Sequence, residues 1–471
     1  MDNINEPLDP ESITSTLDES ALKKTYRLSD PSPEQLENLR RIRKMPFYLR
    51  IFRKFEKGSL RSVVILWVRM TMGIGVMTLP FYMVAYGLLG GIIALIIGSI
   101  VTLLSFLFIF EASVKTGKKN FRDLINELLP GPIAKIFTIT YVYDLTVPTV
   151  CYSAVTWSLF CYVLNFFGLL KESWIEDKNR MLLHEYDPEV FLLRTIYFIV
   201  IFVISIPLFL KKEIGSLKNI AYAFLVVMVA YLIYIMIEAP FFREHYQKQG
   251  TLEVEYLFKT PSWDWVVSFF SMVLAYYVQP FILLLRGELL SPTHKRLNKV
   301  SRYGIIFEAI LFIAFTSICY ISFGDNFTPP LMILRIAYPG KSEITEYIFK
   351  AGLVLFFLLT LFGLCIYNVG VREYLMGFFK FRNERTGYVF FSLFPFFICC
   401  IIALLMPRVT DQLSYAGLLF CNFNGFVIPA LLKLQITKLE RQSRVIQFLL
   451  YLLIAFYVIA GIGGFVVKIL D

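Results

Sequence analysis

The sequence has few of the side chains on which membrane enzymes and metal proteins depend. Only three histidines occur among the 471 residues, and all of them lie between apolar runs, at His184, His245 and His294. HExxH and GxSxG motifs and a carboxylate pair at catalytic spacing are also missing. We therefore expect no enzymatic activity, no metal site and no cofactor, and no histidine proton relay inside a bilayer.

The cysteines give no sign of a disulfide or metal framework. The seven cysteines all fall inside apolar runs, and no CxxC pair occurs. Small apolar packing residues are the simplest interpretation of cysteines in this setting. We therefore predict no functional role for the cysteines.

Long apolar runs dominate the rest of the chain. Hydrophobic residues make up 57% of the sequence and the mean hydropathy is +0.64, whereas soluble domains are about 45–50% apolar. Runs of roughly 20 residues match the length at which a helix crosses a bilayer core. They predict an all-α polytopic membrane protein with eleven transmembrane helices, at residues 61–86, 88–111, 132–169, 190–210, 214–238, 264–286, 303–323, 347–370, 387–406, 412–432 and 445–468.

Charge alternates along the connections between these runs. Lys and Arg gather in alternate loops, for example at 115–122 and 433–444, whereas the loop at 170–189 is acidic. This is the positive-inside pattern, and it predicts a cytosolic N-terminus. The net charge of +10 thus indicates topology, and we expect no nucleic-acid partner. Asn326 begins an Asn-Phe-Thr sequon in a loop on the other side, which makes it a candidate glycosylation site.

The chain divides into three parts. Residues 1–45 are polar and acidic, so we predict a disordered cytosolic tail without a cleavable signal peptide. Residues 46–60 alternate aromatic and basic side chains, which is typical of an amphipathic segment in the headgroup region. Residues 61–471 hold the apolar runs and form the predicted transmembrane transporter domain.

Two of the apolar runs contain helix-breaking residues. Gly73, Ile74 and Gly75 lie in the middle of the first run, and Gln279 precedes Pro280 in the sixth. Unwound backbone at membrane depth is tolerated where it lines a cavity or is buried in protein. Paired interruptions in corresponding runs indicate a transporter binding site between the two halves. Close helix packing through small residues is the alternative for the glycines.

Several segments carry a family resemblance. VRMTMGIGVMTLPFYMVAYG resembles the opening span of the amino acid/auxin permease family, and KKEIGSLKNIAYAFLVVMVAYLIY is similar to its fifth span. FFSMVLAYYVQPFILLLRGEL, followed by ICYISFGDN, resembles the sixth and seventh spans, and YNVGVREYL resembles the end of the eighth. The matches occur in the family's order and cover about residues 58–432.

The resemblance implies a LeuT-like inverted repeat of five plus five helices with one extra helix, embedded in a lipid bilayer. It also implies secondary transport of amino acids, coupled to protons or sodium. The aromatic surroundings favour a small or medium neutral amino acid substrate. The implied substrate-binding residues are Thr71, Gly73, Ile74, Gly75, Tyr141, Ser271, Ala275, Tyr276 and Gln279.

Ion coupling points to four further residues. Relatives often carry Asn where this chain has Arg69, and the eighth span offers only Thr360 as a mid-helix hydroxyl, which disfavours a sodium site. We hypothesise that the Arg69 guanidinium occupies the place of that cation; snorkelling toward the cytosolic surface is the alternative. Proton coupling would need an intramembrane carboxylate, and Asp144 is preferred over Glu308. A pair with Arg69 or a helix-interface hydrogen bond is the structural alternative for Asp144.

The sequence leaves three matters open. A nutrient sensor with the transporter fold, which binds an amino acid and signals through the tail, is the main rival function. Vacuolar, lysosomal and plasma membranes all fit the motifs. Transport driven by protons and transport without a coupling cation both remain consistent with these residues.

Overall fold

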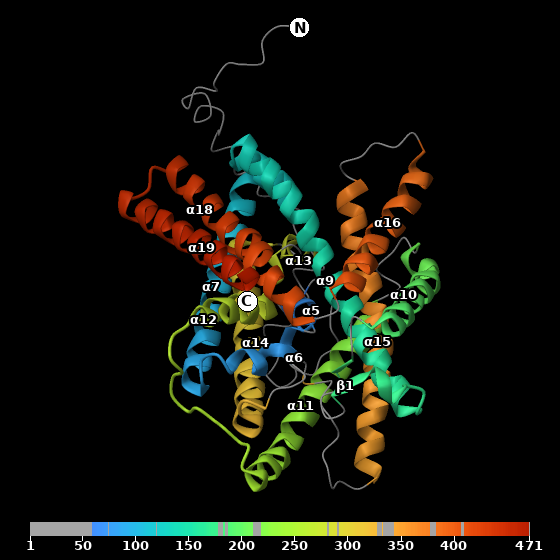
Figure 1. The fold of residues 1–471 in the computed structure, drawn as a ribbon. Helices are drawn as coiled ribbons and strands as arrows, with labels where there is room; N and C mark the ends of the chain where they lie inside the picture. Colours follow the sequence, from blue (N-terminus) through green and yellow to red (C-terminus); the bar gives the residue numbers. More distant parts are fainter. Residues whose placement is uncertain are drawn as a thin grey trace, which may run out of the picture.

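The structure is a computed structural model, shown in Figure 1. It describes residues 59–73, 75–118, 120–177, 182–183, 187–210, 218–279, 282–289, 292–326, 332, 343–376, 383–406 and 409–470. The predicted tail at 1–45, nearly all of the predicted interfacial segment at 46–60, and Ile74 lie outside the described residues.

Helices form most of the described chain. They are α5 (Leu60–Thr71), α6 (Gly75–Met83), α7 (Leu88–Thr116), α8 (Phe121–Leu128), α9 (Gly131–Phe166), α10 (Pro188–Phe209), α11 (Lys218–Gln249), α12 (Trp263–Val273), α13 (Ile282–Glu288), α14 (His294–Phe323), α15 (Glu343–Met376), α16 (Glu384–Leu405), α17 (Val409–Tyr415), α18 (Ile428–Leu439) and α19 (Arg444–Leu470). Short 3-10 turns occur at η1 (Glu172–Trp174) and η3 (Leu274–Tyr276), and π-helical segments at η6 (Ala416–Cys421) and η7 (Phe423–Val427). Strands β1 (Ile175–Asp177) and β2 (Leu182–Leu183) pair antiparallel in the acidic loop.

The helices confirm a polytopic membrane protein. Within the described residues, eight helices are long and apolar enough to cross a bilayer, and the bent pair of α5 and α6 makes a ninth candidate. Large apolar side chains on their outer faces are exposed, such as Ile100 at 52%, Ile204 at 61% and Ile459 at 68%. In a soluble protein this surface would drive aggregation, whereas a bilayer covers it.

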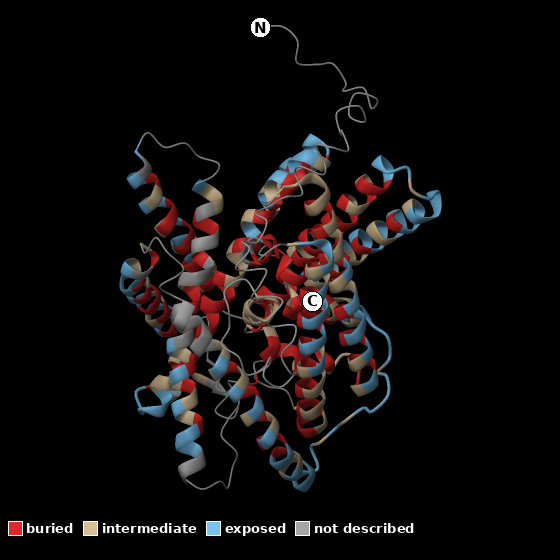
Figure 2. Ribbon diagram, turned by 180° about the vertical axis from the view of Figure 1, so that it is seen from behind, coloured by how far each residue is buried: buried red, intermediate tan, exposed pale blue. Residues whose placement is uncertain are grey.

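Buried residues gather where the helices cross one another, and exposed residues line the outer faces and the helix ends (Figure 2). The helices α9 and α15 pack along one another, and α12 packs on α6, α7 and η6. At this last contact a Cβ on Gly417 would lie 2.8 Å from the Phe270 carbonyl oxygen. Only glycine lets the π-helical segment η6 approach the α12 backbone so closely. Most of α6 and the C-terminal half of α12 are buried among the other helices.

Candidate functional site

The first helix is interrupted between α5 and α6. The α5 helix ends at Thr71, α6 begins at Gly75, and the two are bent by 61°. The Met72 amide still donates to the Val68 carbonyl at 2.8 Å, so the break begins directly after it. The first amides of a helix lack partners within that helix and lie at the positive end of its dipole. The start of α6 can therefore receive a carboxylate.

The second interruption separates α12 and η3 from α13. Tyr277 is extended, with φ −78° and ψ 112°, and α13 begins at Ile282. The Gln279 side chain is fully buried; its amide donates to Ser105 Oγ at 3.4 Å and its oxygen accepts from the Val278 amide at 3.0 Å. The predicted break of this helix is thus present, and the Gln279 side chain accepts a hydrogen bond from the backbone amide of Val278 at the break.

The two interruptions meet. A Cβ placed on Gly75 would lie 3.5 Å from Ala275 Cα and 3.7 Å from Ala275 Cβ. These are ordinary van der Waals distances, so the start of α6 rests against η3. Since neither glycine nor alanine carries a side chain beyond Cβ, the backbones of the two broken helices lie close together here. The structure therefore brings Gly75 and Ala275, both predicted site residues, into one place.

The second break is tied to a buried carboxylate. The Tyr277 hydroxyl donates to the carboxylate of Asp144 in α9, which is 4% exposed. One turn before Asp144 on the same face of α9, Thr140 Oγ1 donates to the side-chain oxygen of Asn424 in η7 at 3.0 Å. Asp144 therefore makes a helix-interface hydrogen bond, one of the alternatives considered from the sequence. Segments of π-helix, such as η7, occur often at functional sites.

The same region extends to α7. Ser105 receives the Gln279 amide and donates its own hydroxyl to the Gly425 carbonyl in η7. A Cβ on Gly425 would lie 2.8 Å from the Tyr277 ring, so this glycine leaves room for the tyrosine. We define the Asp144 network as Ser105, Thr140, Asp144, Tyr277, Gln279 and Asn424. It joins α7, α9 and η7 to the break after η3.

The first break is tied to the other predicted carboxylate. The Thr71 hydroxyl, in the last turn of α5, donates to the carboxylate of Glu308 in α14, which is fully buried. The second oxygen of Glu308 and the hydroxyl of Tyr276 have no hydrogen-bond partner within the described residues. The Tyr276 ring packs on Phe312, one turn beyond Glu308, at 4.9 Å between ring centres. Two unpartnered polar atoms thus lie beside the first break, where burying them carries a free-energy cost.

Arg69 lies beside the same break. It is half-buried in the last turn of α5, one turn before Gly73. A cation at the C-terminal end of a helix is stabilised by the helix dipole. This placement gives a physical reason for an arginine next to the unwound segment.

Four other predicted residues make contacts within their own helices or with neighbouring helices and loops. Ser271 Oγ donates to the Val267 carbonyl at 2.8 Å and lies 3.4 Å from Ser414 Oγ in α17. The Tyr141 ring packs on Tyr374 of α15, with 4.7 Å between ring centres. Thr360 donates to the Phe357 carbonyl at 2.8 Å within α15. Asn326, the predicted glycosylation site, donates its side-chain amide to the Thr251 carbonyl at 2.9 Å.

Four members of the Asp144 network are not among the site residues predicted from the sequence: Ser105, Thr140, Tyr277 and Asn424. An asparagine inside an apolar run is itself a signal, because an amide in the bilayer needs a partner. Ser105 gives a weaker signal, since serine is common between packed membrane helices. Tyr277 cannot be separated from its neighbour Tyr276 without knowing where the helix ends.

Solved structures share the overall fold. Two crystal structures of the manganese transporter of Eremococcus coleocola, one with an aromatic bis-isothiourea substituted compound and one of a histidine-to-alanine mutant, each superpose with a TM-score of 0.53. The first is 11% identical and the alignment covers 87% of this chain and 86% of that one; the second is 10% identical, with 88% and 89% covered. At this identity the likeness concerns the fold alone.

Sequence comparisons identify the family. Vacuolar amino acid transporter 5 of Saccharomyces cerevisiae is 24% identical over 298 residues, which span 61% of this chain and 61% of that relative. The family model described as transmembrane amino acid transporter protein matches residues 56–470. This match confirms the resemblance found in the apolar runs and excludes the enzyme class. The chain belongs to the transmembrane amino acid transporter family.

Proposed function

We propose that this protein is a secondary active transporter of small or medium neutral amino acids, which bind where the two broken helices meet. The contact between Gly75 and Ala275 carries the proposal. The substrate carboxylate would meet the backbone at Gly73 to Gly75, at the positive end of α6. Its ammonium group would meet the carbonyls that end the η3 turn, near Tyr276.

The contact distance has a consequence for the transport cycle. A Cβ added to Gly75 would already lie 3.5 Å from Ala275 Cα, so the space between the two residues has room for about one methyl group and not for an amino acid. Substrate entry therefore requires α6 and η3 to separate, and their return to contact follows release. Short half-helices can move in this way because each is joined to the bundle by unwound backbone.

The architecture that we propose has eleven spans. The pair α5 and α6 would form the first, α12 with η3 and α13 the sixth, and α19 the eleventh, after two inverted halves of five. The basic segments at 115–122 and 433–444 then face the cytosol together with the N-terminal tail. The yeast relative bears the name of a vacuolar transporter, which favours an internal membrane of the vacuolar or lysosomal kind over the plasma membrane.

For coupling, we propose that Asp144 exchanges a proton during the cycle. Its carboxylate accepts from Tyr277, at the moving break, so a change in its charge alters a bond that holds that break. Glu308 with Thr71 is the second candidate, at the other break. Arg69 would supply the positive charge that a sodium ion supplies elsewhere, which makes transport independent of sodium.

Flux through reconstituted vesicles tests the proposal. The purified chain in proteoliposomes should take up neutral amino acids, and uptake should rise when a pH gradient is imposed and stay unchanged when a sodium gradient is imposed. Binding without flux would instead identify a nutrient sensor. Uptake that requires sodium would refute the role given to Arg69.

A further inference from the structure

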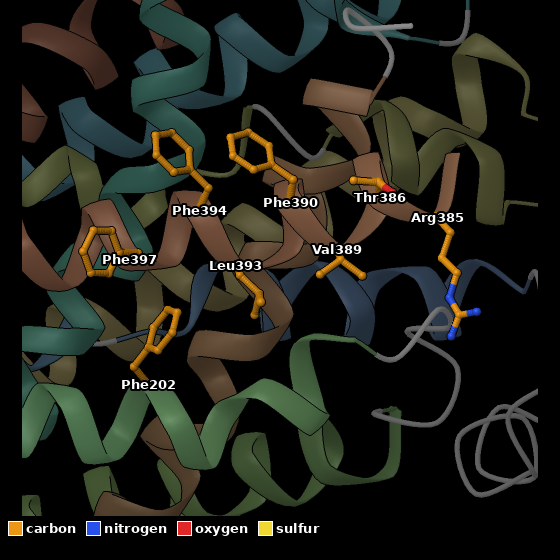
Figure 3. A pocket seen from close by; sticks show the side chains of 8 residues that line it. All are labelled: Phe202, Arg385, Thr386, Val389, Phe390, Leu393, Phe394 and Phe397. Atoms are coloured by element: carbon orange, nitrogen blue, oxygen red, sulfur yellow. The ribbon is translucent and has the colours of Figure 1, made fainter. Parts of the chain in front are cut away.

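One groove on the outer face of the molecule is unrelated to the two breaks. It has a volume of about 650 Å³ and lies between α10 and α16, which run side by side at one edge of the bundle (Figure 1). Its lining is labelled in Figure 3: Phe202, Arg385, Thr386, Val389, Phe390, Leu393, Phe394 and Phe397. All but one of these residues belong to α16.

The residues from α16 form one continuous stripe. They recur at intervals of one, three and four residues along the helix, which places them on a single face. From Arg385 to Phe397 the stripe covers thirteen residues, and the twelve steps between them span about 18 Å at 1.5 Å per residue. One leaflet of a bilayer core is about 15 Å thick, half of the full 30 Å. The groove therefore has the length of one layer of acyl chains.

The groove is polar at one end only. Arg385 and Thr386 lie in the first turn of α16, and Figure 3 shows the guanidinium extending away from the aromatic rings. Asn383 accepts from the Arg385 amide at 3.0 Å and fixes this turn. Beyond it, the walls are aromatic and aliphatic; Phe390, Phe394 and Phe397 are 44%, 47% and 49% exposed.

Phe202 of α10 forms the wall opposite α16, and aromatic packing fixes its position. The Phe202 ring of α10 stacks on Phe396, with 5.7 Å between centres and 7° between planes, and meets the edge of Phe397 at 5.9 Å. Since Phe396 is fully buried, it anchors Phe202 against α16. The far end of the groove is thus formed by packed rings.

We propose that this groove binds one molecule of an anionic phospholipid. An acyl chain would lie along the stripe from Val389 to Phe397, and the phosphate group would bind Arg385 and Thr386. A zwitterionic lipid would fill the same walls, but its own cation would offset the attraction to Arg385. The inference depends on the membrane location of the chain and is independent of its substrate.

Photolabelling tests the site in the full chain. The protein is placed in phosphatidylcholine vesicles with a trace of phosphatidylserine that bears a photoactivatable group in its acyl chain, or with the matching phosphatidylcholine probe. Labelled peptides are then identified by mass spectrometry. The serine probe should label residues 389–397 about five-fold more than the choline probe, as expected for one arginine at the membrane surface.

Two variants and one control define the outcome. Arg385→Gln should remove the five-fold preference, whereas Arg444→Gln, at the exposed start of α19, should leave it unchanged. Leu393→Trp should fill the groove and reduce labelling of this stripe by both probes. Equal labelling by the two probes in the unaltered protein, or equal effects of the two arginine substitutions, would overturn the proposal.

Discussion

The two helix breaks are stabilised in different ways. The break after Thr71 is tied to Glu308 by one hydroxyl, and polar atoms beside it lack partners within the described residues. The break at Tyr277 is tied to Asp144 in a network that reaches α7 and η7. The second break is also more tightly enclosed. A Cβ added to Gly75, at the first break, would lie at ordinary contact distance from Ala275, whereas a Cβ added to Gly425 would collide with the ring of Tyr277 at the second break. We infer that the first break is suited to receive a solute and the second to couple its movement to a charge.

The largest effect is expected from Asp144→Asn. An asparagine keeps the shape but cannot carry or release a proton, so uptake driven by a pH gradient should fall by roughly ten- to a hundredfold, the equivalent of a charged hydrogen bond of about 1.5–3 kcal/mol. Uptake into proteoliposomes measures it. Asp411→Asn is the control, because Asp411 pairs with Lys468 at 3.1 Å in a half-exposed position. Equal uptake by the Asp144 variant and the unaltered protein would remove Asp144 from the mechanism.

At the first break, Thr71→Val removes the hydroxyl while it keeps the volume. The Glu308 carboxyl then loses its donor in a buried setting, which should destabilise the protein by about 1–3 kcal/mol. Thr71→Ser retains the hydroxyl and should stay close to the original. The melting temperature of the purified protein in detergent compares the two. An identical melting temperature for the valine and serine variants would show that this hydrogen bond does not hold the break.

Gly425→Ala probes the enclosure of the second break. Its new Cβ would lie 2.8 Å from the Tyr277 ring, so the ring or the η7 backbone must shift, which disturbs the hydrogen bond from Tyr277 to Asp144. Overpacking of this kind costs about 1–3 kcal/mol. We expect a lower melting temperature together with weaker dependence of uptake on pH. A variant with an unchanged pH profile would separate Gly425 from the Asp144 network.

Gly75→Ala should have the smallest effect on stability. The added Cβ meets Ala275 at ordinary contact distance, and alanine favours helix by about 1 kcal/mol over glycine. The melting temperature should therefore stay level or rise slightly, while uptake falls because the start of α6 becomes more rigid. A marked drop in melting temperature would mean that the two breaks lie closer together than described.

Much of this comparison could be predicted from the sequence. The helix-breaking residues predict the positions of both interruptions. Because burying a charge is costly, the sequence also indicates Asp144 and Glu308 as candidate functional carboxylates. Partners could not be predicted, because they come from helices far away in the chain: Tyr277 is 133 residues from Asp144, and Glu308 is 237 residues from Thr71. The roles of Tyr141 and Thr360 stay predictions, since they rest on residue type, which does not determine the direction in which a helix presents a side chain.

The glycines of η6 and η7 show the same limit. Gly417 and Gly425 look like ordinary small residues in an apolar run, since their role depends on backbone and ring atoms of a different helix. The π-helical turns that position them follow from tertiary packing rather than from local propensity.

A disulfide between Gly75→Cys and Ala275→Cys tests the central claim most directly. The Cβ atoms would be 3.7 Å apart, within the range of about 3.5–4.5 Å that a disulfide requires. The pair is introduced into a chain whose seven native cysteines are replaced, and uptake is measured after oxidation and again after reduction. We predict that oxidation stops uptake, that reduction restores it, and that a transported amino acid slows the cross-link. Full uptake with the disulfide formed would contradict a substrate site between the two broken helices.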